Sequence, residues 1–382
     1  MPIAVTFAPQ ARVAVFLTSF HPGGTERQMV ELVRRLDPAR FAVSVACLHR
    51  EGAWLPRVEE AATDVTQFQL SGFARPSFGR ALRDFAGWCR ARAIQIVQTC
   101  DFYANVVGLT GAALARVPVR IGSRREINPD KSRPQIALQR FAYAAAHRVV
   151  ANSPAAAAQL AIEGVRGDRI RVIPNGIALE RFLPKAHHSR IGSLITVANL
   201  RPEKRHDVLL EAFSRLDASR GLTLRIVGDG SCRAALECQA RDLGVAPRVE
   251  FLGHREDVAE LLATSDLFVL PSQSEAFPNG ALEAMATGLP VVASSVGGLL
   301  DLIEHERNGL LVPPANPQAL AEAIERLIAQ PTLATALGES ARRHVRDRYS
   351  FERTVAGFEH LFLSELHARA PLASERTVAT SA

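Results

Sequence analysis

Cysteine and long apolar runs are both scarce in this sequence of 382 residues. Its five cysteines form no Cys-x-x-Cys pair, which supports neither a disulfide framework nor a zinc site, so we expect reduced cysteines packed inside a cytoplasmic protein. The apolar run 267–270 is closed by Asp266 and Pro271, far short of the roughly 20 residues of a membrane-spanning helix. The first ten residues carry no basic leader, so we expect no signal peptide. The cysteines are Cys47, Cys89, Cys100, Cys232 and Cys238.

Lysine is almost absent, with 3 Lys against 42 Arg, and charge is divided unevenly along the chain. Residues 1–185 hold 25 Lys and Arg against 14 Asp and Glu, whereas residues 186–382 hold 20 against 25. A basic first half indicates an anionic partner such as an anionic membrane surface, although a solvated Arg-rich surface gives the same count. Aromatic residues make up only 6%, and no zinc-finger, RNP or basic-helix motif occurs, so we expect no nucleic-acid partner.

Short apolar runs alternate with amphipathic stretches in two successive series. This alternation predicts parallel sheets covered by helices on both faces. We therefore expect an α/β fold of two tandem doubly wound Rossmann-like domains facing a central cleft, with a ligand at the carboxyl ends of the strands. The polar stretch 184–190 predicts the linker, which gives domains over 1–185 and 186–347. The expected strands are 12–18, 43–48, 94–98, 117–122 and 148–151, then 194–198, 222–227, 249–252, 267–270, 291–294 and 309–312.

Gly23 and Gly24 directly follow the first predicted strand. Paired glycines let the backbone approach a ligand closely, and the free amides that open the next helix favour an anion. A structural turn explains the pair equally well. The spacing is not Gly-x-Gly-x-x-Gly, which counts against a nicotinamide enzyme.

Two loops of the second series carry residues suited to a phosphorylated ligand. Loop 198–206 is cationic, and Lys204 stands out because the chain otherwise uses Arg; a solvated surface loop is the alternative. Loop 276–280 leads into a helix near Gly280, whose amides face an anion or a sugar. Glu283 in its first turn can accept from vicinal hydroxyls, or it simply complements the helix dipole. Gly228 follows strand 222–227. A glycine there allows a nucleotide to approach the backbone closely, but it fits an ordinary turn between a strand and a helix equally well.

The string SEAFPNGALEAMATGLPVVAS, in which seven residues separate Glu275 from Glu283, resembles the retaining, nucleotide-sugar-dependent glycosyltransferase family 4. The resemblance covers most of residues 12–365 and is most specific in 265–313. Segments that agree in the same order are PGGTERQMVELVRRL, RVIPNGIALERF, VANLRPEKRHDVLLEAF, LRIVGDG, VEFLGHREDV and GLLDLIEHERNGLLVPP.

This resemblance implies the GT-B architecture, with an acceptor-binding first domain and a donor-binding second domain. A helix over 348–367 is expected to cross back to the first domain, followed by a disordered tail over 368–382. Lys204, together with Arg201, would hold the diphosphate as it leaves, and Glu275 would lie near the hydroxyls of the donor sugar. The other donor-binding residues that the family implies are Gly23, Gly24, Gly228, His254, Arg255, Phe277, Pro278, Asn279, Gly280 and Glu283.

The chain departs from the family pattern at two positions. Asn199 stands five residues before Lys204, where relatives commonly have Arg, so the cation that accompanies Lys204 is open, with Arg201 the nearest candidate. Arg124 follows strand 117–122 in the place where several relatives have His. An arginine there can bind an acceptor phosphate or the departing diphosphate, but it is a poor general base at neutral pH.

The resemblance also implies a reaction and an acceptor. We expect front-face transfer assisted by the leaving phosphate, without a metal or other cofactor, since no Asp-x-Asp occurs in the chain. The expected acceptor is a lipid-linked sugar or polysaccharide at the inner face of the cytoplasmic membrane, with the protein cytoplasmic and peripheral. Alternatives are a sugar-nucleotide epimerase on the same fold, a non-catalytic sugar-nucleotide-binding protein, or a phosphorylase. A phosphorylase would need a pyridoxal-binding lysine, and Lys131 and Lys185 lie in unpromising polar stretches.

Overall fold

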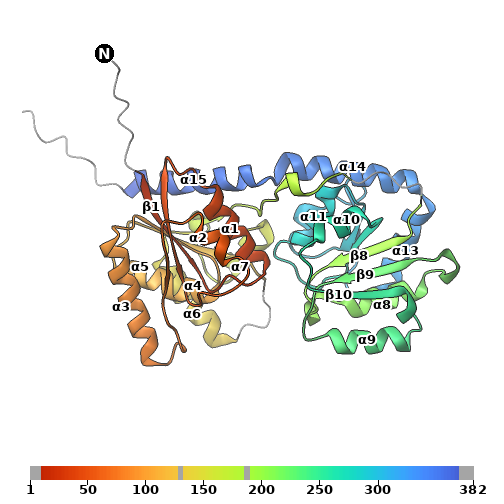
Figure 1. Cartoon of the computed structure of the whole chain (residues 1–382), viewed down its shortest axis with the longest axis horizontal. Helices are drawn as coiled ribbons and strands as arrows, with labels where there is room; N and C mark the ends of the chain where they lie inside the picture. The colour runs from red at the N-terminus through yellow and green to blue at the C-terminus, as the bar shows by residue number, and fades with distance from the viewer. Residues whose placement is uncertain (1–9, 128–131, 185–189, 370–382) are drawn as a thin grey trace, which may run out of the picture.

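The computed structural model describes residues 10–127, 132–184 and 190–369. It confirms the expected α/β architecture of two parallel sheets, one in each lobe of the chain (Figure 1). Most of the predicted linker and of the predicted disordered tail lies outside the described residues. Within those residues, no helix is long and apolar enough to cross a membrane.

The first lobe is built on a seven-stranded parallel sheet in the order β3-β2-β1-β4-β5-β6-β7. Its strands are β1 (Ala11–Leu17), β2 (Phe41–Cys47), β3 (Val65–Gln67), β4 (Ile96–Thr99), β5 (Val119–Arg124), β6 (Arg148–Ala151) and β7 (Ile170–Val172). Its α-helices are α1 (Gly24–Arg35), α2 (Leu55–Glu59), α3 (Pro76–Ala91), α4 (Phe102–Ala104), α5 (Thr110–Leu114), α6 (Arg133–Ala145) and α7 (Pro154–Ile162).

The second lobe is built on a six-stranded parallel sheet in the order β10-β9-β8-β11-β12-β13. Its strands are β8 (Ser193–Val197), β9 (Thr223–Val227), β10 (Val249–Gly253), β11 (Leu267–Leu270), β12 (Val291–Ser294) and β13 (Leu310–Val312). The helices that follow in the chain are α8 (His206–Arg215), α9 (Arg233–Asp242), α10 (Val258–Ala263), α11 (Asn279–Thr287), α12 (Gly298–Leu302), α13 (Pro317–Ala329), α14 (Pro331–Arg348) and α15 (Phe351–Arg369).

The prediction missed the two outermost strands of the first sheet, β3 and β7. Each has only three residues, and their side chains are partly or fully exposed. Neither segment therefore carries the longer apolar run or alternation by which strands are recognised. The strand expected at 117–122 was also placed two residues too early, since β5 ends at Arg124.

Strand order reverses once in each sheet, and these reversals position the ligand site. Strand β1 lies between β2 and β4, and β8 lies between β9 and β11, so consecutive crossovers leave in opposite directions. In open α/β sheets a crevice forms at such a switch point, outside the carboxyl ends of the strands. The loops after β1, β8 and β11 therefore face the space between the lobes.

The chain passes between the lobes at two places that lie side by side. The amide of Ile177 donates to the carbonyl of Tyr349 at 2.8 Å, and the amide of Phe351 donates to the carbonyl of Ile177 at 3.2 Å. Helix α14 precedes this crossing, and α15 follows it along the same edge of the molecule (Figure 1). Helix α15 buries Phe358 and Phe362 in the core of the first lobe, with Phe362 against Phe41.

Candidate functional site

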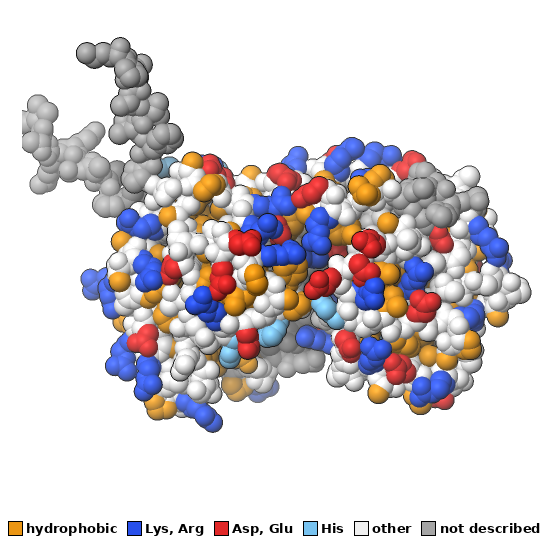
Figure 2. All heavy atoms as spheres, viewed as in Figure 1, with side chains coloured by type: hydrophobic (Ala, Val, Ile, Leu, Met, Phe, Trp, Pro, Cys, Tyr) orange, Lys and Arg blue, Asp and Glu red, His pale blue; other side chains and the backbone are white. Residues whose placement is uncertain are grey.

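A cleft of about 400 Å³ lies between the two lobes, and the molecular surface is notched there (Figure 2). It is lined by residues that follow β1, β8, β9, β10 and β11, and by the first turns of α1 and α11. The predicted site residues that line it are Gly23, Gly24, Lys204, Gly228, His254, Arg255, Glu275, Phe277, Pro278, Asn279, Gly280 and Glu283.

Lys204 and Glu275 form an ion pair inside the second lobe. Their Nζ and Oε1 atoms lie 2.7 Å apart, and the Oγ of Ser272 donates to the same carboxylate oxygen at 2.7 Å. The Glu275 side chain is 7% exposed and that of Lys204 is 20% exposed. Burying a carboxylate this deeply is costly unless a cation and hydrogen-bond donors contact it, and both are present.

The backbone around Glu275 is held in place by the glycine pair that opens α12. Gly297 has a φ of +45°, and a Cβ on it would strike the carbonyl of Glu275. The amide of Gly298 donates to that same carbonyl at 2.8 Å. A side chain at Gly297 would therefore displace the Glu275 loop.

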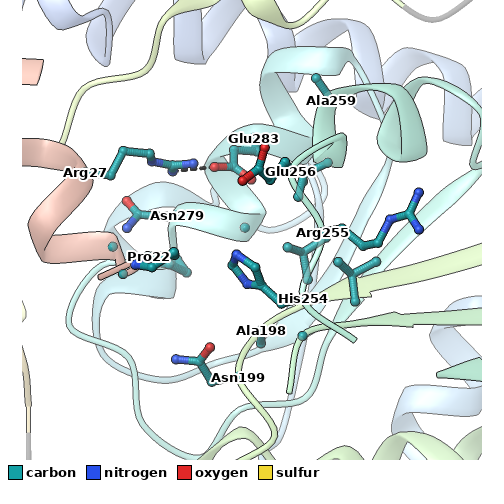
Figure 3. Close-up of a pocket in the computed structure, with 18 of the residues that line it drawn as sticks. Pro22, Arg27, Ala198, Asn199, His254, Arg255, Glu256, Ala259, Asn279 and Glu283 are labelled. Atoms are coloured by element: carbon teal, nitrogen blue, oxygen red, sulfur yellow. Dashed lines mark ion pairs between the residues drawn. The ribbon is translucent and has the colours of Figure 1, made fainter. Parts of the chain in front are cut away.

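Glu283 is paired with Arg27, which belongs to the first lobe. The guanidinium Nη2 of Arg27 contacts Oε1 of Glu283, whose side chain is only 4% exposed. Arg27 reaches Glu283 from the first turn of α1, and Asn279 and Pro22 line the same cavity (Figure 3). Arg27 lies within the predicted glycine motif, and no role was expected for it from the sequence. Arg27 lies one helical turn after Gly24 and therefore on the same face of the helix. This spacing was the signal in the sequence for a cation that faces the cleft.

The first turns of α1 and α11 approach each other closely across the cleft. A Cβ on Gly24 would collide with Nδ2 of Asn279. Asn279 also accepts a hydrogen bond of 2.9 Å from Nδ2 of Asn175, which precedes the crossing between the lobes. Asn175 lies in the segment RVIPNGIALERF, and no role was expected for it from the sequence. The two helix N-termini thus direct their free amides into one cavity.

Arg125 is a buried cation beneath this contact. Its Nη1 donates to Oδ1 of Asn175 at 2.6 Å, whereas Nε and Nη2 have no hydrogen-bond partner among the described residues. Burial lowers the pKa of Arg125 to about 10, which leaves it charged at neutral pH. Burial also raises the pKa of the nearby Glu26 above its usual value, partly offset by a backbone hydrogen bond.

Two predicted site residues are not brought into the cleft. Arg124 is 1% exposed, and its Nη1 and Nη2 donate to the carboxylate of Glu163 at 3.0 and 2.9 Å. Because β5 extends to residue 124, Arg124 points to the face of the sheet that α7 covers. Arg201 is exposed and does not belong to the described residues that line the cleft.

Other cleft residues were not anticipated. Trp54 and Arg57 line it from the first lobe, with the Arg57 guanidinium 4.6 Å from the centre of the Trp54 ring. Glu256 lines the cleft from the second lobe (Figure 3). The segment around Trp54 lies between predicted elements and carried no motif, so sequence alone offered no signal for it.

Two family models match separate parts of the chain. The description "Glycosyltransferase Family 4" applies to residues 22–181, and "Glycosyl transferases group 1" applies to residues 188–344. Together these matches include both walls of the cleft.

Curated relatives match over parts of their length. A D-inositol 3-phosphate glycosyltransferase of Geodermatophilus obscurus is 35% identical over 293 residues, which is 70% of this chain and 61% of that protein. An N-acetyl-alpha-D-glucosaminyl L-malate synthase of Bacillus anthracis is 34% identical over 173 residues, 45% of each chain. An exopolysaccharide phosphotransferase of Streptomyces coelicolor is 39% identical over 210 residues, 54% of this chain and 22% of that protein. The chain thus spans between about a fifth and three fifths of these relatives.

Solved structures match over nearly the whole chain. Anabaena HepE in complex with UDP and glucose superposes with a TM-score of 0.82 at 23% identity, covering 93% of this chain and 100% of that one. Sucrose-phosphate synthase of Thermosynechococcus elongatus gives 0.82 at 20% identity, covering 94% and 100%. Likeness at this identity establishes the fold, which is the GT-B arrangement expected from the sequence.

Proposed function

Because the chain belongs to glycosyltransferase family 4, we propose that it transfers a sugar from a nucleotide-sugar donor to an acceptor hydroxyl, with retention of anomeric configuration. One observation carries this proposal: both buried carboxylates of the motif, Glu275 and Glu283, face the cleft with a cation on each, beside the N-terminus of α11. Cations and free helix amides gathered in a sheltered cleft suit a diphosphate leaving group.

The donor is proposed to lie along the second lobe. Lys204 and the amides that open α11 would neutralise the diphosphate, and Glu283 would accept hydrogen bonds from the ribose hydroxyls. Gly228 and the segment His254–Arg255 line the part of the cleft assigned to the nucleoside. The UDP and glucose bound to HepE support a nucleoside diphosphate sugar as donor.

The proposed chemistry is a front-face substitution. The bond between the anomeric carbon and the phosphate oxygen breaks, the acceptor oxygen bonds to that carbon on the same face, and the acceptor proton moves to the departing phosphate. Glu275 stays paired with Lys204 near the donor sugar and forms no covalent intermediate. Trapping a glycosyl adduct on any carboxylate of the chain would overturn this mechanism, and the anomeric configuration of the product, read by NMR, tests retention.

Metal independence is part of the proposal. It is supported by the lack of an Asp-x-Asp motif in the sequence and by the cations and helix amides available for the diphosphate. Full turnover after exhaustive chelation is the expected result. Activity that chelation abolishes and Mg²⁺ or Mn²⁺ restores would contradict it.

We further propose a lipid-linked or polysaccharide acceptor at an anionic inner membrane surface, with the protein cytoplasmic and peripheral. The support is the excess of 25 basic over 14 acidic residues in the first 185. Co-sedimentation with anionic vesicles at low salt, reversed by high salt, is expected. Equal recovery in the supernatant with neutral and anionic vesicles would count against membrane association.

The donor site is tested by a thermal-shift panel of UDP-, GDP- and ADP-sugars. A ligand at 100 times its dissociation constant adds about 2.7 kcal/mol, which is readily seen. We expect a shift with one donor class that is lost in Lys204→Ala and Glu283→Ala and kept in Glu325→Ala, an exposed glutamate on α13. A donor that is isomerised without acceptor would indicate an epimerase, and binding without turnover on any acceptor a non-catalytic binding protein.

A further inference from the structure

We propose that Arg27, contributed by the first lobe, is a second cation on the donor diphosphate, beside Lys204 of the second lobe. This inference rests on the proposed donor site. In this proposal Lys204 of the second lobe and Arg27 of the first lobe both contact the diphosphate.

The cationic loop of the second lobe brings a single charge to the cleft. Of its described residues 198–206, Ala198, Asn199 and Lys204 line the cavity, and only Lys204 among these is charged. Arg201 is exposed outside the cavity. A diphosphate carries more than one negative charge, so this loop alone leaves part of it without a cation.

Arg27 stands where a second cation can reach the same ligand. It follows Gly23 and Gly24 on the first turn of α1, which faces the first turn of α11 across the cleft. In Figure 3 its guanidinium points across the cavity toward Glu283, with Asn279 below it. The side chain is 25% exposed, so a ligand in the cleft can contact it.

The contact with Glu283 orients the Arg27 guanidinium and leaves N–H groups of Arg27 available for phosphate oxygens. The nearest atoms of the ion pair are Nη2 of Arg27 and Oε1 of Glu283, and a guanidinium has five N–H donors in a planar fork. One nitrogen can therefore stay on Glu283 while the others hold phosphate oxygens. The arrangement parallels that of Lys204, whose ammonium is held by Glu275.

Because Arg27 belongs to the first lobe, it couples the two lobes to the diphosphate. A nucleoside without phosphates would use the second lobe and gain nothing from Arg27. A nucleoside diphosphate would bind both lobes and draw them together. The two kinds of ligand thus distinguish Arg27 as a phosphate contact from Arg27 as a mere support of Glu283.

The test compares UDP, GDP and ADP with uridine, guanosine and adenosine. Nucleotides are titrated by calorimetry and nucleosides by ligand-observed NMR, against the wild type, Arg27→Gln and Arg27→Lys. For the base that binds, we expect Arg27→Gln to weaken the diphosphate about tenfold or more and to leave the nucleoside within about twofold. Arg27→Lys should fall between them because it keeps the charge and loses the fork.

Two further variants control for folding. Arg34→Gln, an exposed position on the same helix, should bind both ligands like the wild type. Arg27→Gln leaves Glu283 buried without its cation, so Arg27→Gln/Glu283→Gln is included to remove that charge. The double variant should regain thermal stability, which is the only property read from it because Glu283 itself belongs to the proposed ribose site.

The outcomes separate this inference from the proposed function. Equal weakening of nucleoside and diphosphate in Arg27→Gln would overturn the inference, because Arg27 would then act only through Glu283. A loss specific to the diphosphate in Arg201→Gln, with Arg27→Gln unaffected, would overturn it in favour of Arg201. If the wild type binds none of the six ligands, the donor site itself is refuted, and the inference falls with it.

Discussion

Replacing Lys204 by alanine removes one half of an ion pair whose other half, Glu275, is buried at the bottom of the cleft. After the change the carboxylate keeps the hydrogen bond from Ser272 and loses the ammonium 2.7 Å away. Breaking a buried pair in this way costs about 3–5 kcal/mol when both partners are fully enclosed. Lys204 is one-fifth exposed and Ser272 remains, so we expect the loss to be about 1–3 kcal/mol.

The same substitution is expected to reduce turnover far more than it reduces stability. Removing one preorganised donor from a developing anion lowers the rate by about 10²–10³. Lower turnover of Lys204→Ala could result from lower stability alone, since an unstable protein also loses activity. Lys204→Ala/Glu275→Gln separates them because it removes the unpaired charge together with the cation.

The assay pairs melting temperature with kcat for the four members of this double-mutant cycle. For a domain of this size each kcal/mol corresponds to about 2–4 °C. Lys204→Ala should melt lower, and the double variant should regain most of that loss while its kcat stays down by about 10²–10³. Recovery of kcat along with the melting temperature would refute the reasoning, because Lys204 would then have only a structural part.

Three further outcomes follow from the packing. Glu163→Gln leaves Arg124 buried without a counter-ion and should destabilise the first lobe by about 3–5 kcal/mol in urea; a change under about 1 kcal/mol would contradict this. Burial and the neighbouring Lys204 lower the pKa of His206 to about 4 from 6.5, so the unfolded chain takes up a proton below pH 6.5 that the folded chain refuses. Stability should therefore fall by about 3 kcal/mol between pH 6.5 and 4, and His206→Leu should flatten that slope; an unchanged slope would show another group responsible. Gly24→Val should lower kcat/KM at least tenfold by displacing the Asn279 side chain from the first turn of α1 and from its hydrogen bond with Asn175, and unchanged kcat/KM would contradict this.

The fold was largely predictable because its central strands are buried on both faces. Runs such as 267–270 and 291–294 consist of apolar residues throughout, so they stand out in the sequence. The edge strands β3 and β7 do not stand out, because each has only three residues, all partly or fully exposed, and such a segment resembles a loop in the sequence. The late end of β5 mattered more for the site, because it turns Arg124 toward Glu163 and away from the cleft.

Site residues were predictable where the chemistry lies within one contiguous motif. Glu275, Glu283 and the loop between them follow a single strand and reach the cleft together. Residues whose partners come from distant segments were missed. Asn175 contacts Asn279, which is 104 positions away, and no local pattern reports such a contact.

The ion pair between Arg27 and Glu283 joins the two lobes, and part of it could have been inferred from the sequence. Glu283 lies in the first turn of a buried helix, and a carboxylate enclosed to that extent requires a counter-ion. The loop after β8 brings Asn199 and Lys204 to the cleft, and Lys204 is already paired with Glu275, so the counter-ion of Glu283 comes from the other lobe. Parallel sheets facing each other bring the loop after β1 to the loop after β11, and Arg27 is the cation that directly follows the glycine pair there. The ion pair between Arg27 and Glu283 thus joins two lobes through residues that lie far apart in the sequence.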